Sequence, residues 1–246
     1  MQRAVVHVFL GLLLTVSFLH AQSPDASLLR TMLLDKDPEI RVKAAEGLGR
    51  VGGRQAVIIL RQGLADNNTT VRIAVVEALG FIGGRLAMTV LSESLKDGNP
   101  EVRIRVVEAL KDAGTVNSVP ILQKAFGDNN ESVRLHAALM LRKIGHRSGV
   151  PVLGKLAVDD KSAAVRAAAA AHLGKVGVKD PRAVGVLARI LEDKDPAVRI
   201  RAVESLGFLQ LPQAITVLRS ALEDPDTGVR IRATEVMGHV LAKDFE

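Results

Sequence analysis

Seven arginines recur along this 246-residue chain at intervals of 31 to 33 residues. They are Arg41, Arg72, Arg103, Arg134, Arg166, Arg199 and Arg230. A repeat of this length is typical of an array of one supersecondary unit, not of an ordinary globular domain. One such unit cannot cover its own apolar face, so the core is expected to lie between neighbouring units.

Two further positions recur with each arginine. An aspartate stands six residues before it: Asp35, Asp66, Asp97, Asp128, Asp160, Asp193 and Asp224. Four residues before it stands a side chain that can accept hydrogen bonds: Asp37, Asn68, Asn99, Asn130, Ser162, Asp195 and Asp226. Such side chains satisfy the free N–H groups of a first helical turn, so these seven positions are predicted helix N-caps.

Apolar residues follow each cap at helical spacing, one before, three after and seven after the arginine, as in Val198, Ala202 and Leu206. This spacing predicts a helix with one buried stripe, which we call helix B of the repeat. A second apolar set before each aspartate predicts a helix A. Five glycines directly after the last stripe residue are expected to mark helix ends: Gly49, Gly80, Gly174, Gly207 and Gly238.

A helix pair with a D-x-x-x-x-V-R turn and an A-L-G motif resembles the HEAT repeat, specifically its phycobilisome-lyase-like class, from about Ser23 to Val240. The resemblance implies an all-α fold, a right-handed α-solenoid of about seven two-helix repeats. It also implies that the recurring aspartates and arginines lie at the turns and link neighbouring repeats in a ladder. These fourteen residues are therefore expected to be architectural.

The first 21 residues differ from the repeats. A short positive start is followed by an apolar run from Ala4 to Leu19, and Ala21 precedes a plausible cut before Gln22. This pattern predicts a secretory signal peptide over 1–21, followed by one repeat domain over 22–246. A bacterial protein exported to the periplasm or beyond is the expected outcome, with no stable membrane span after cleavage. An uncleaved anchor is the alternative.

One row of helix B suggests a binding surface. In HEAT proteins the position directly after the arginine lines the concave face, and here the row is apolar: Val42, Ile73, Ile104, Leu135, Ala167, Ile200 and Ile231. An exposed apolar ribbon marks a partner site, so Ile73, Ile104, Leu135 and Ile200 are candidate contacts. The alternative is that these side chains pack sideways against the next B helix.

Charged residues flank that row. Helix B carries a basic row two residues after the arginine, as in Arg105 and Arg201, and an acidic row five residues after it, as in Glu108 and Glu204. Residues three apart on a helix can pair, so these rows are expected to neutralise one another. In the middle repeats the rows become His136 and Leu139, which join the candidate partner contacts.

Other function classes have less support. The deoxyhypusine hydroxylases share the fold and bind iron through His-Glu dipeptides just after the repeat arginine, but no such dipeptide stands there in this chain. No catalytic residue, metal site or cofactor is predicted. An accessory enzyme of the lyase-like family, of lyase or oxidoreductase type, is the alternative function.

Nucleic-acid binding is suggested only by the net charge of +6 and the pI near 9.8. The chain has no Trp and no Tyr to stack on bases, and its acidic and basic rows alternate. The expected partner is a protein or peptide, and no nucleic acid. End-to-end self-association through the C-terminal repeat is a further alternative, because that repeat ends at an apolar helix B.

Overall fold

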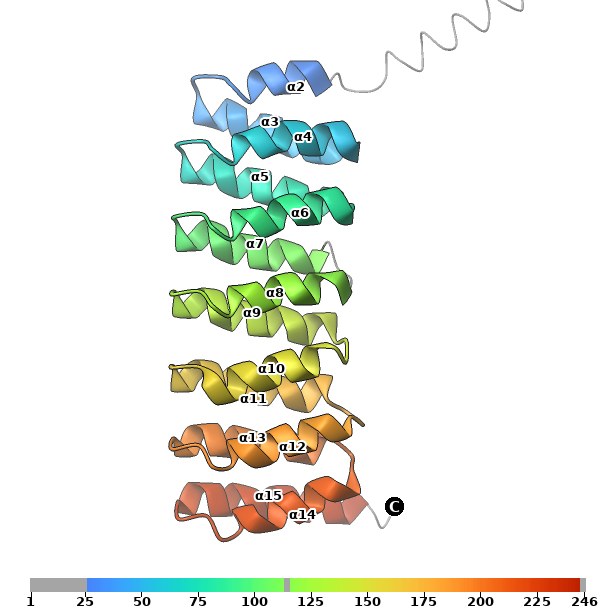
Figure 1. The fold of residues 1–246 in the computed structure, drawn as a ribbon, viewed down its shortest axis with the longest axis vertical. Helices are drawn as coiled ribbons and strands as arrows, with labels where there is room; N and C mark the ends of the chain where they lie inside the picture. Colours follow the sequence, from blue (N-terminus) through green and yellow to red (C-terminus); the bar gives the residue numbers. More distant parts are fainter. Residues whose placement is uncertain (1–25, 113–115, 244–246) are drawn as a thin grey trace, which may run out of the picture. The chain divides into compact units, whose positions relative to one another are not determined.

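The computed structural model describes residues 26–112 and 116–243, which fold into α-helices joined by short turns (Figure 1). The described chain forms two compact units, one ending at Ser94 and one beginning at Leu95. The boundary falls inside the third repeat. The single repeat domain predicted from the sequence, over 22–246, includes both units.

Fourteen α-helices alternate along the described residues as seven A–B pairs, which confirms the predicted all-α solenoid class. The A helices are α2 (Ala26–Met32), α4 (Gly53–Gly63), α6 (Gly84–Ser94), α8 (Val119–Ala125), α10 (Gly149–Asp159), α12 (Pro181–Ile190) and α14 (Pro212–Ala221). The B helices are α3 (Pro38–Val51), α5 (Thr69–Ile82), α7 (Pro100–Asp112), α9 (Glu131–Ile144), α11 (Ala163–Val176), α13 (Pro196–Phe208) and α15 (Thr227–Lys243). A short 3-10 turn, η1 (Val116–Ser118), precedes α8.

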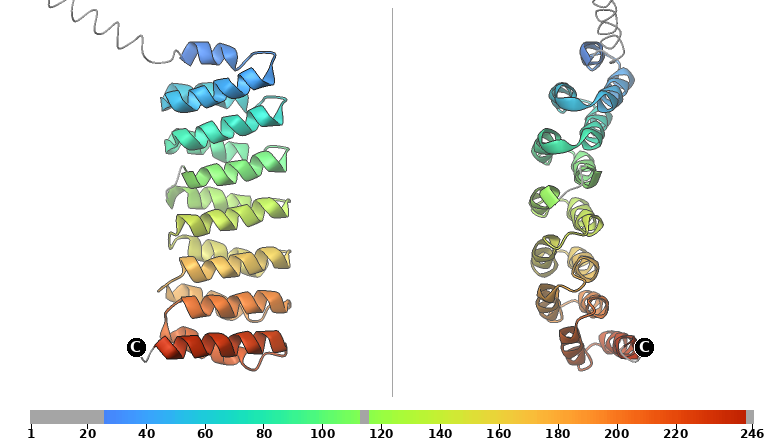
Figure 2. Two further views of the ribbon diagram at one scale, coloured as in Figure 1. Left: turned by 180° about the vertical axis from the view of Figure 1, so that it is seen from behind. Right: turned by 90° about the vertical axis from the view of Figure 1, so that its right-hand side faces the viewer.

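Within each unit the B helices form one layer and the A helices a second (Figure 2). In the second unit α7, α9, α11, α13 and α15 pack on one another in sequence order. The predicted apolar stripe is buried between the layers, as Val133, Ala137 and Leu141 of α9 show. The core of each unit therefore consists of apolar side chains that pack between the two layers and between successive repeats.

The predicted N-caps all cap their helices. The Asn130 side chain accepts hydrogen bonds from the backbone N–H groups of Ser132 and Val133, at 2.9 and 3.3 Å. The other six caps accept from the first turn of their helices in the same way: Asp37, Asn68, Asn99, Ser162, Asp195 and Asp226. The start of every B helix is thus fixed by local chemistry.

The expectation that five glycines mark the ends of the B helices is wrong. Gly49, Gly80, Gly174, Gly207 and Gly238 all lie inside their helices, which continue for one or more residues. Gly49, Gly174 and Gly207 allow close packing: a Cβ added at Gly174 would lie 2.8 Å from the Cα of Ser205 on the next B helix. Helices α3 and α5 instead end at Gly52 and Gly83, where φ is 68° and 64°.

The recurring arginines and aspartates form an inter-repeat ladder, in which five arginines bind the aspartate of the following repeat. Arg134 donates from Nε and Nη2 to the carboxylate of Asp160, at 2.7 and 3.0 Å, and from Nη1 to the backbone carbonyl of Asp128, at 2.9 Å. The same bidentate pairing joins Arg41 to Asp66, Arg103 to Asp128, Arg166 to Asp193 and Arg199 to Asp224. Each of these five arginines therefore binds its own turn through a carbonyl and the next turn through a carboxylate.

The ladder carboxylates also hold their own turns. Oδ1 of Asp128 accepts the backbone N–H of Asn130 at 2.9 Å, two residues on, and the same bond recurs at Asp66, Asp160, Asp193 and Asp224. The hydrogen bond from Arg199 lowers the pKa of Asp224 below its ordinary value of 3.8, although burial opposes the change. At Asp66, Asp128 and Asp193 burial raises the pKa, but the hydrogen bonds from arginine and backbone outweigh it and the net pKa is lowered.

Because of these lowered pKa values, the contribution of the ladder to the free energy of unfolding depends on pH. A carboxyl whose pKa is lower in the folded chain stabilises the fold above its unfolded value of 3.8, and this contribution is lost as the pH falls through the folded value. We therefore expect Asp224→Asn to lower the free energy of unfolding at neutral pH, and this deficit should shrink below pH 3.8. Urea denaturation of both chains across the pH range measures it. A deficit of constant size down to the acid transition would contradict the role of the ionised carboxylate.

The predicted signal peptide, residues 1–21, lies outside the described residues. Among the helices that the structure describes, none combines the length and the apolar character needed to cross a membrane.

Candidate partner-binding surface on the B helices

The apolar row after the ladder arginines is half-buried. Ile73, Ile104, Leu135 and Ile200 are neither fully covered nor exposed, whereas Ile231 of the last B helix is 55% exposed. A terminal carbon of Ile200 lies 3.7 Å from the position of a Cβ added at Gly228, on the following B helix. These side chains are therefore partly covered, at Ile200 by the next B helix as the alternative interpretation expects, and partly exposed to solvent.

The basic and acidic rows pair as predicted. Lys43 with Glu46, Arg105 with Glu108, Arg201 with Glu204 and Arg232 with Glu235 are ion pairs of 2.7–3.0 Å within one helix. Glu204 is also bound at 2.7 Å by Arg232 of the following helix. Most charge on this surface is neutralised locally, so it offers no continuous basic track.

The middle of the second unit is the least charged part of this surface. His136 of α9 lies 3.7 Å from Glu108 through Nε2, while its Nδ1 bonds the carbonyl of Ser132. Leu139 is half-buried beside it, and the following helix places Ala168 and Ala171 at the corresponding positions. The structure thus brings His136 and Leu139 to one surface, which is shallow there because the side chains on α11 are small.

His172 of α11 is the most perturbed histidine. Burial, together with the charge of Arg142, lowers its pKa from 6.5 to about 4, so the ring is neutral near pH 7. It stands at the register that Met140 and Ser205 occupy in the neighbouring repeats, both of them buried. His172 is therefore a packing residue of the inter-repeat contact.

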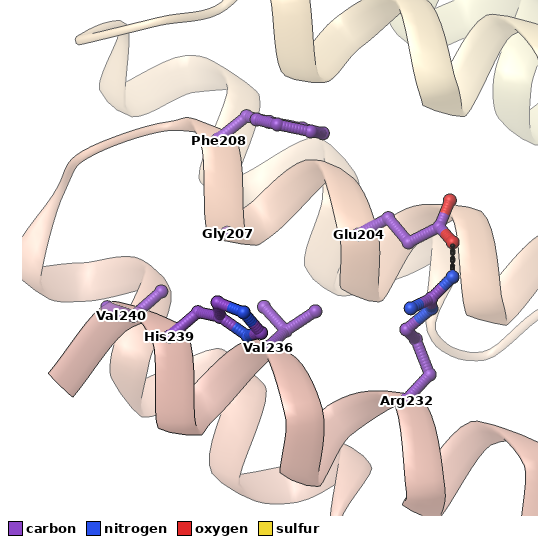
Figure 3. Close-up of a pocket in the computed structure, with 7 residues that line it drawn as sticks. All are labelled: Glu204, Gly207, Phe208, Arg232, Val236, His239 and Val240. Carbon is purple, nitrogen blue, oxygen red and sulfur yellow. Dashed lines mark ion pairs between the residues drawn. The ribbon is translucent and has the colours of Figure 1, made fainter. Parts of the chain in front are cut away.

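A groove lies between α13 and α15 on the B helices of the second unit. Its volume is about 320 Å³, and it is lined by Glu204, Gly207, Phe208, Arg232, Val236, His239 and Val240 (Figure 3). A Cβ added at Gly207 would lie 2.6 Å from a methyl carbon of Val236, so the two helices lie close together beside the groove. The absence of a side chain at Gly207 therefore helps to shape the groove.

The two sides of the groove differ in chemistry. The Glu204–Arg232 ion pair closes one end (Figure 3). The negative charge of Glu204 raises the pKa of Arg232, which stays protonated. Val236, Val240 and the ring of Phe208 supply apolar surface. Nδ1 of His239 lies 2.8 Å from the carbonyl oxygen of Glu235. A carbonyl can only accept, so Nδ1 is the donor, and Nε2 is then the acceptor of the neutral ring.

Phe208 is a surface residue that the sequence analysis missed. Its side chain is 48% exposed, and the ammonium of Lys175 lies 3.6 Å from the centre of the ring. Phe81, nine residues after its ladder arginine like Phe208, is 76% exposed. The signal was present in the sequence: an aromatic residue twice occupies a position that elsewhere carries a charged or polar side chain.

No metal centre is formed by the residues that the structure describes: no three histidine, aspartate or glutamate side chains gather into a group able to hold an ion. His136, His146, His172 and His239 lie in three different B helices and one turn.

Comparison with known proteins identifies the repeat. The family model described as HEAT repeats matches residues 26–99, 88–174 and 150–238. A search of curated proteins finds no match to the chain.

Three solved structures illustrate the similarity of fold. Human deoxyhypusine hydroxylase in complex with glycerol is 20% identical, with a TM-score of 0.48 over 89% of this chain and 98% of that chain. The complex of CpcE and CpcF of phycocyanin lyase from Nostoc sp. PCC7120 is 21% identical, with a TM-score of 0.48 over 87% and 94%. An engineered protein is 20% identical, with a TM-score of 0.48 over 88% and 68%. At this identity the likeness concerns the fold alone, and it is the family model, matching almost every described repeat, that establishes that the chain belongs to the HEAT-repeat family.

Proposed function

We propose that this protein is an exported, non-enzymatic HEAT-repeat scaffold that binds a protein or peptide on the surface of its B helices. The observation that carries the proposal is the groove between α13 and α15, where apolar walls and a fixed ion pair lie within one depression. Export is proposed from the apolar segment over residues 1–21.

The groove suits one anchoring side chain of a partner segment. Phe208, Val236 and Val240 would cover an apolar side chain, and an anchor of this kind usually carries most of the energy of an interface. Lys175, above the ring of Phe208, favours an acidic residue next to that anchor, whereas the charge of Arg232 is already balanced by Glu204 and Glu235. The expected partner motif is therefore an apolar residue flanked by an acidic one.

The lining of the groove supports binding better than catalysis. Glu204 is held by both Arg201 and Arg232, so its carboxylate is already paired. His239 is the remaining titratable group, and the seven lining residues include no hydroxyl or amine nucleophile that it could activate. A general base needs such a neighbour within hydrogen-bond reach.

The test begins with the chain as an exporting host releases it. We expect mass spectrometry to show cleavage near Ala21 and recovery outside the cytoplasm; an intact Met1 start in a soluble cytosolic form would contradict export. The released chain then serves as bait in the extracytoplasmic fraction, and captured proteins are compared between wild type and variants.

The variants separate the groove from exposed aromatic surface in general. Phe208→Ser is expected to weaken capture roughly tenfold, because it removes an anchor wall worth at least about 1.4 kcal/mol. Phe81→Ser, at the same register of a B helix in the first unit, should leave capture unchanged. Unchanged capture by the Phe208 variant, with an unchanged melting temperature, would contradict the groove as the binding site.

A further inference from the structure

Successive repeats meet through an interface of three parts. The first is the ladder ion pair, such as Arg199 with Asp224. The second, present in five of the seven repeats, is a glycine eight residues after the ladder arginine, which receives the next B helix, as Gly174 receives Ser205 and Gly207 receives Val236. The third lies between A helices, where Val186 of α12 covers Gly154 of α10 at 3.0 Å from an added Cβ. A repeat therefore has a leading face and a trailing face of different chemistry.

The last B helix carries a complete trailing face with nothing on it among the described residues. Arg230 donates to the carbonyls of Asp224 and Pro225 and to the hydroxyl of Thr227, but it meets no carboxylate there. An added Cβ at Gly238 has nothing within 4 Å, in contrast to Gly174 and Gly207 at the same register. Ile231 is 55% exposed. The ladder arginine and the glycine of the B-helix contact are thus in place, and among the described residues nothing covers them.

The first repeat carries the matching leading face. Asp35 accepts the backbone N–H of Asp37 at 2.8 Å, as every ladder aspartate does, but no arginine in the described chain reaches its carboxylate. Leu28 of α2 is 62% exposed, whereas Ile59 and Val90, at the same register of the next two A helices, are each 2% exposed. Val186 shares this register and faces the preceding repeat, so Leu28 is exposed where a preceding repeat would cover it.

We infer that the chain self-associates head to tail, with the C-terminal repeat of one copy stacked on the N-terminal repeat of the next and Arg230 bound to Asp35 of the second copy. The argument for a second copy is complementarity: one chain carries both halves of its own repeat interface, an open guanidinium at one end and an open carboxylate at the other. Terminal repeats of a solenoid normally carry a polar outer face, whereas Leu28 of the first described repeat and Ile231 of the last are large apolar side chains left exposed. This inference does not depend on the proposed groove.

The geometry of this contact determines the kind of assembly. The two faces are different surfaces, so the contact is heterologous and each copy keeps one free face after pairing. Growth therefore continues beyond the dimer, into a ring or an open filament. Association should rise with protein concentration and weaken with salt, because the Arg230–Asp35 pair is electrostatic.

A charge swap tests the register of the contact. Arg230→Asp places two carboxylates opposite one another in a homotypic contact, and Asp35→Arg places two guanidinium groups there, so each variant alone should be monomeric by sedimentation velocity. Mixed in equal amounts, the two variants restore an ion pair at every junction, and association should return to the wild-type concentration dependence. Lys161→Asp, an exposed turn cation in the middle of the second unit, makes the same change of charge and should leave association unaltered.

A second variant guards against loss of folding. Gly238→Gln fills the open notch, which the folded monomer tolerates because nothing lies within 4 Å, yet it should abolish association. Each variant is checked by circular dichroism melting. The inference would be overturned if the wild-type chain stayed monomeric at every concentration, which would indicate that residues outside the described ranges cover these ends. It would also be overturned if the folded single-charge variants associated as well as the wild type.

Discussion

Arg134→Ala is expected to lower the free energy of unfolding by roughly 3 kcal/mol or more, because it leaves the buried carboxylate of Asp160 without its partner. The side chains of Arg134 and Asp160 are 3% and 4% exposed, and the arginine also holds the carbonyl of Asp128. The substitution therefore breaks the connection between two repeats and weakens one turn at the same time. Urea denaturation followed by circular dichroism measures the loss.

Arg105→Ala is the matched control. This arginine lies two residues after the ladder arginine of its repeat, is 42% exposed, and pairs with Glu108 on the surface of α7. A surface substitution of this kind usually changes stability by about 0.5 kcal/mol or less. Equal denaturation midpoints and slopes for the two variants would show that the ladder does not stabilise the fold.

Gly174→Ala and Gly238→Ala are expected to change stability in opposite directions, although both replace a glycine at the same register inside a B helix. At Gly174 the new Cβ would meet the backbone of Ser205 at 2.8 Å and force two helices apart, an overpacking that costs about 1–3 kcal/mol. At Gly238 the Cβ enters open space, and the higher helix propensity of alanine should stabilise α15 by about 1 kcal/mol.

Thermal melts of the two glycine variants at low protein concentration make the comparison, since self-association would otherwise raise the apparent stability of the wild type. If both substitutions stabilise the chain, the glycines are not required for close packing, and the interpretation of their register fails. If both destabilise it, the C-terminal repeat is covered in solution by residues that lie outside the described ranges.

The features that could be predicted from the sequence are those set by local chemistry. The N-caps precede the ladder arginines by a fixed four residues, and the hydrogen bond from the side chain of Asn130 to the N–H of Ser132 spans only two residues. The buried stripe of each B helix follows from its spacing alone. Such interactions join residues only a few positions apart in the chain, so they can be predicted without knowing how the repeats stack.

The features that could not be predicted from the sequence depend on contacts between repeats. The spacing places Asp128 six residues before Arg134 and by itself suggests a pair within one turn, yet the carboxylate that Arg134 binds belongs to Asp160. Only the resemblance to HEAT repeats implied a link between neighbouring repeats. Glycines such as Gly174 look like helix ends until the next helix is seen to press against them. The groove at Phe208 was missed for the same reason, because its walls come from two helices.

The ladder also bears on how a chain like this can change in length. Five arginines of the ladder meet the aspartate of the next repeat in the same bidentate manner: Arg41, Arg103, Arg134, Arg166 and Arg199. Each of those aspartates holds its own turn in the same manner, as at Asp128 and Asp224. Excision or duplication of one whole unit, cut between an arginine and the following aspartate, would leave the same pair across the new junction. A deletion of any other length would bring unlike residues together. The ladder is therefore preserved only when the chain is lengthened or shortened by whole repeats.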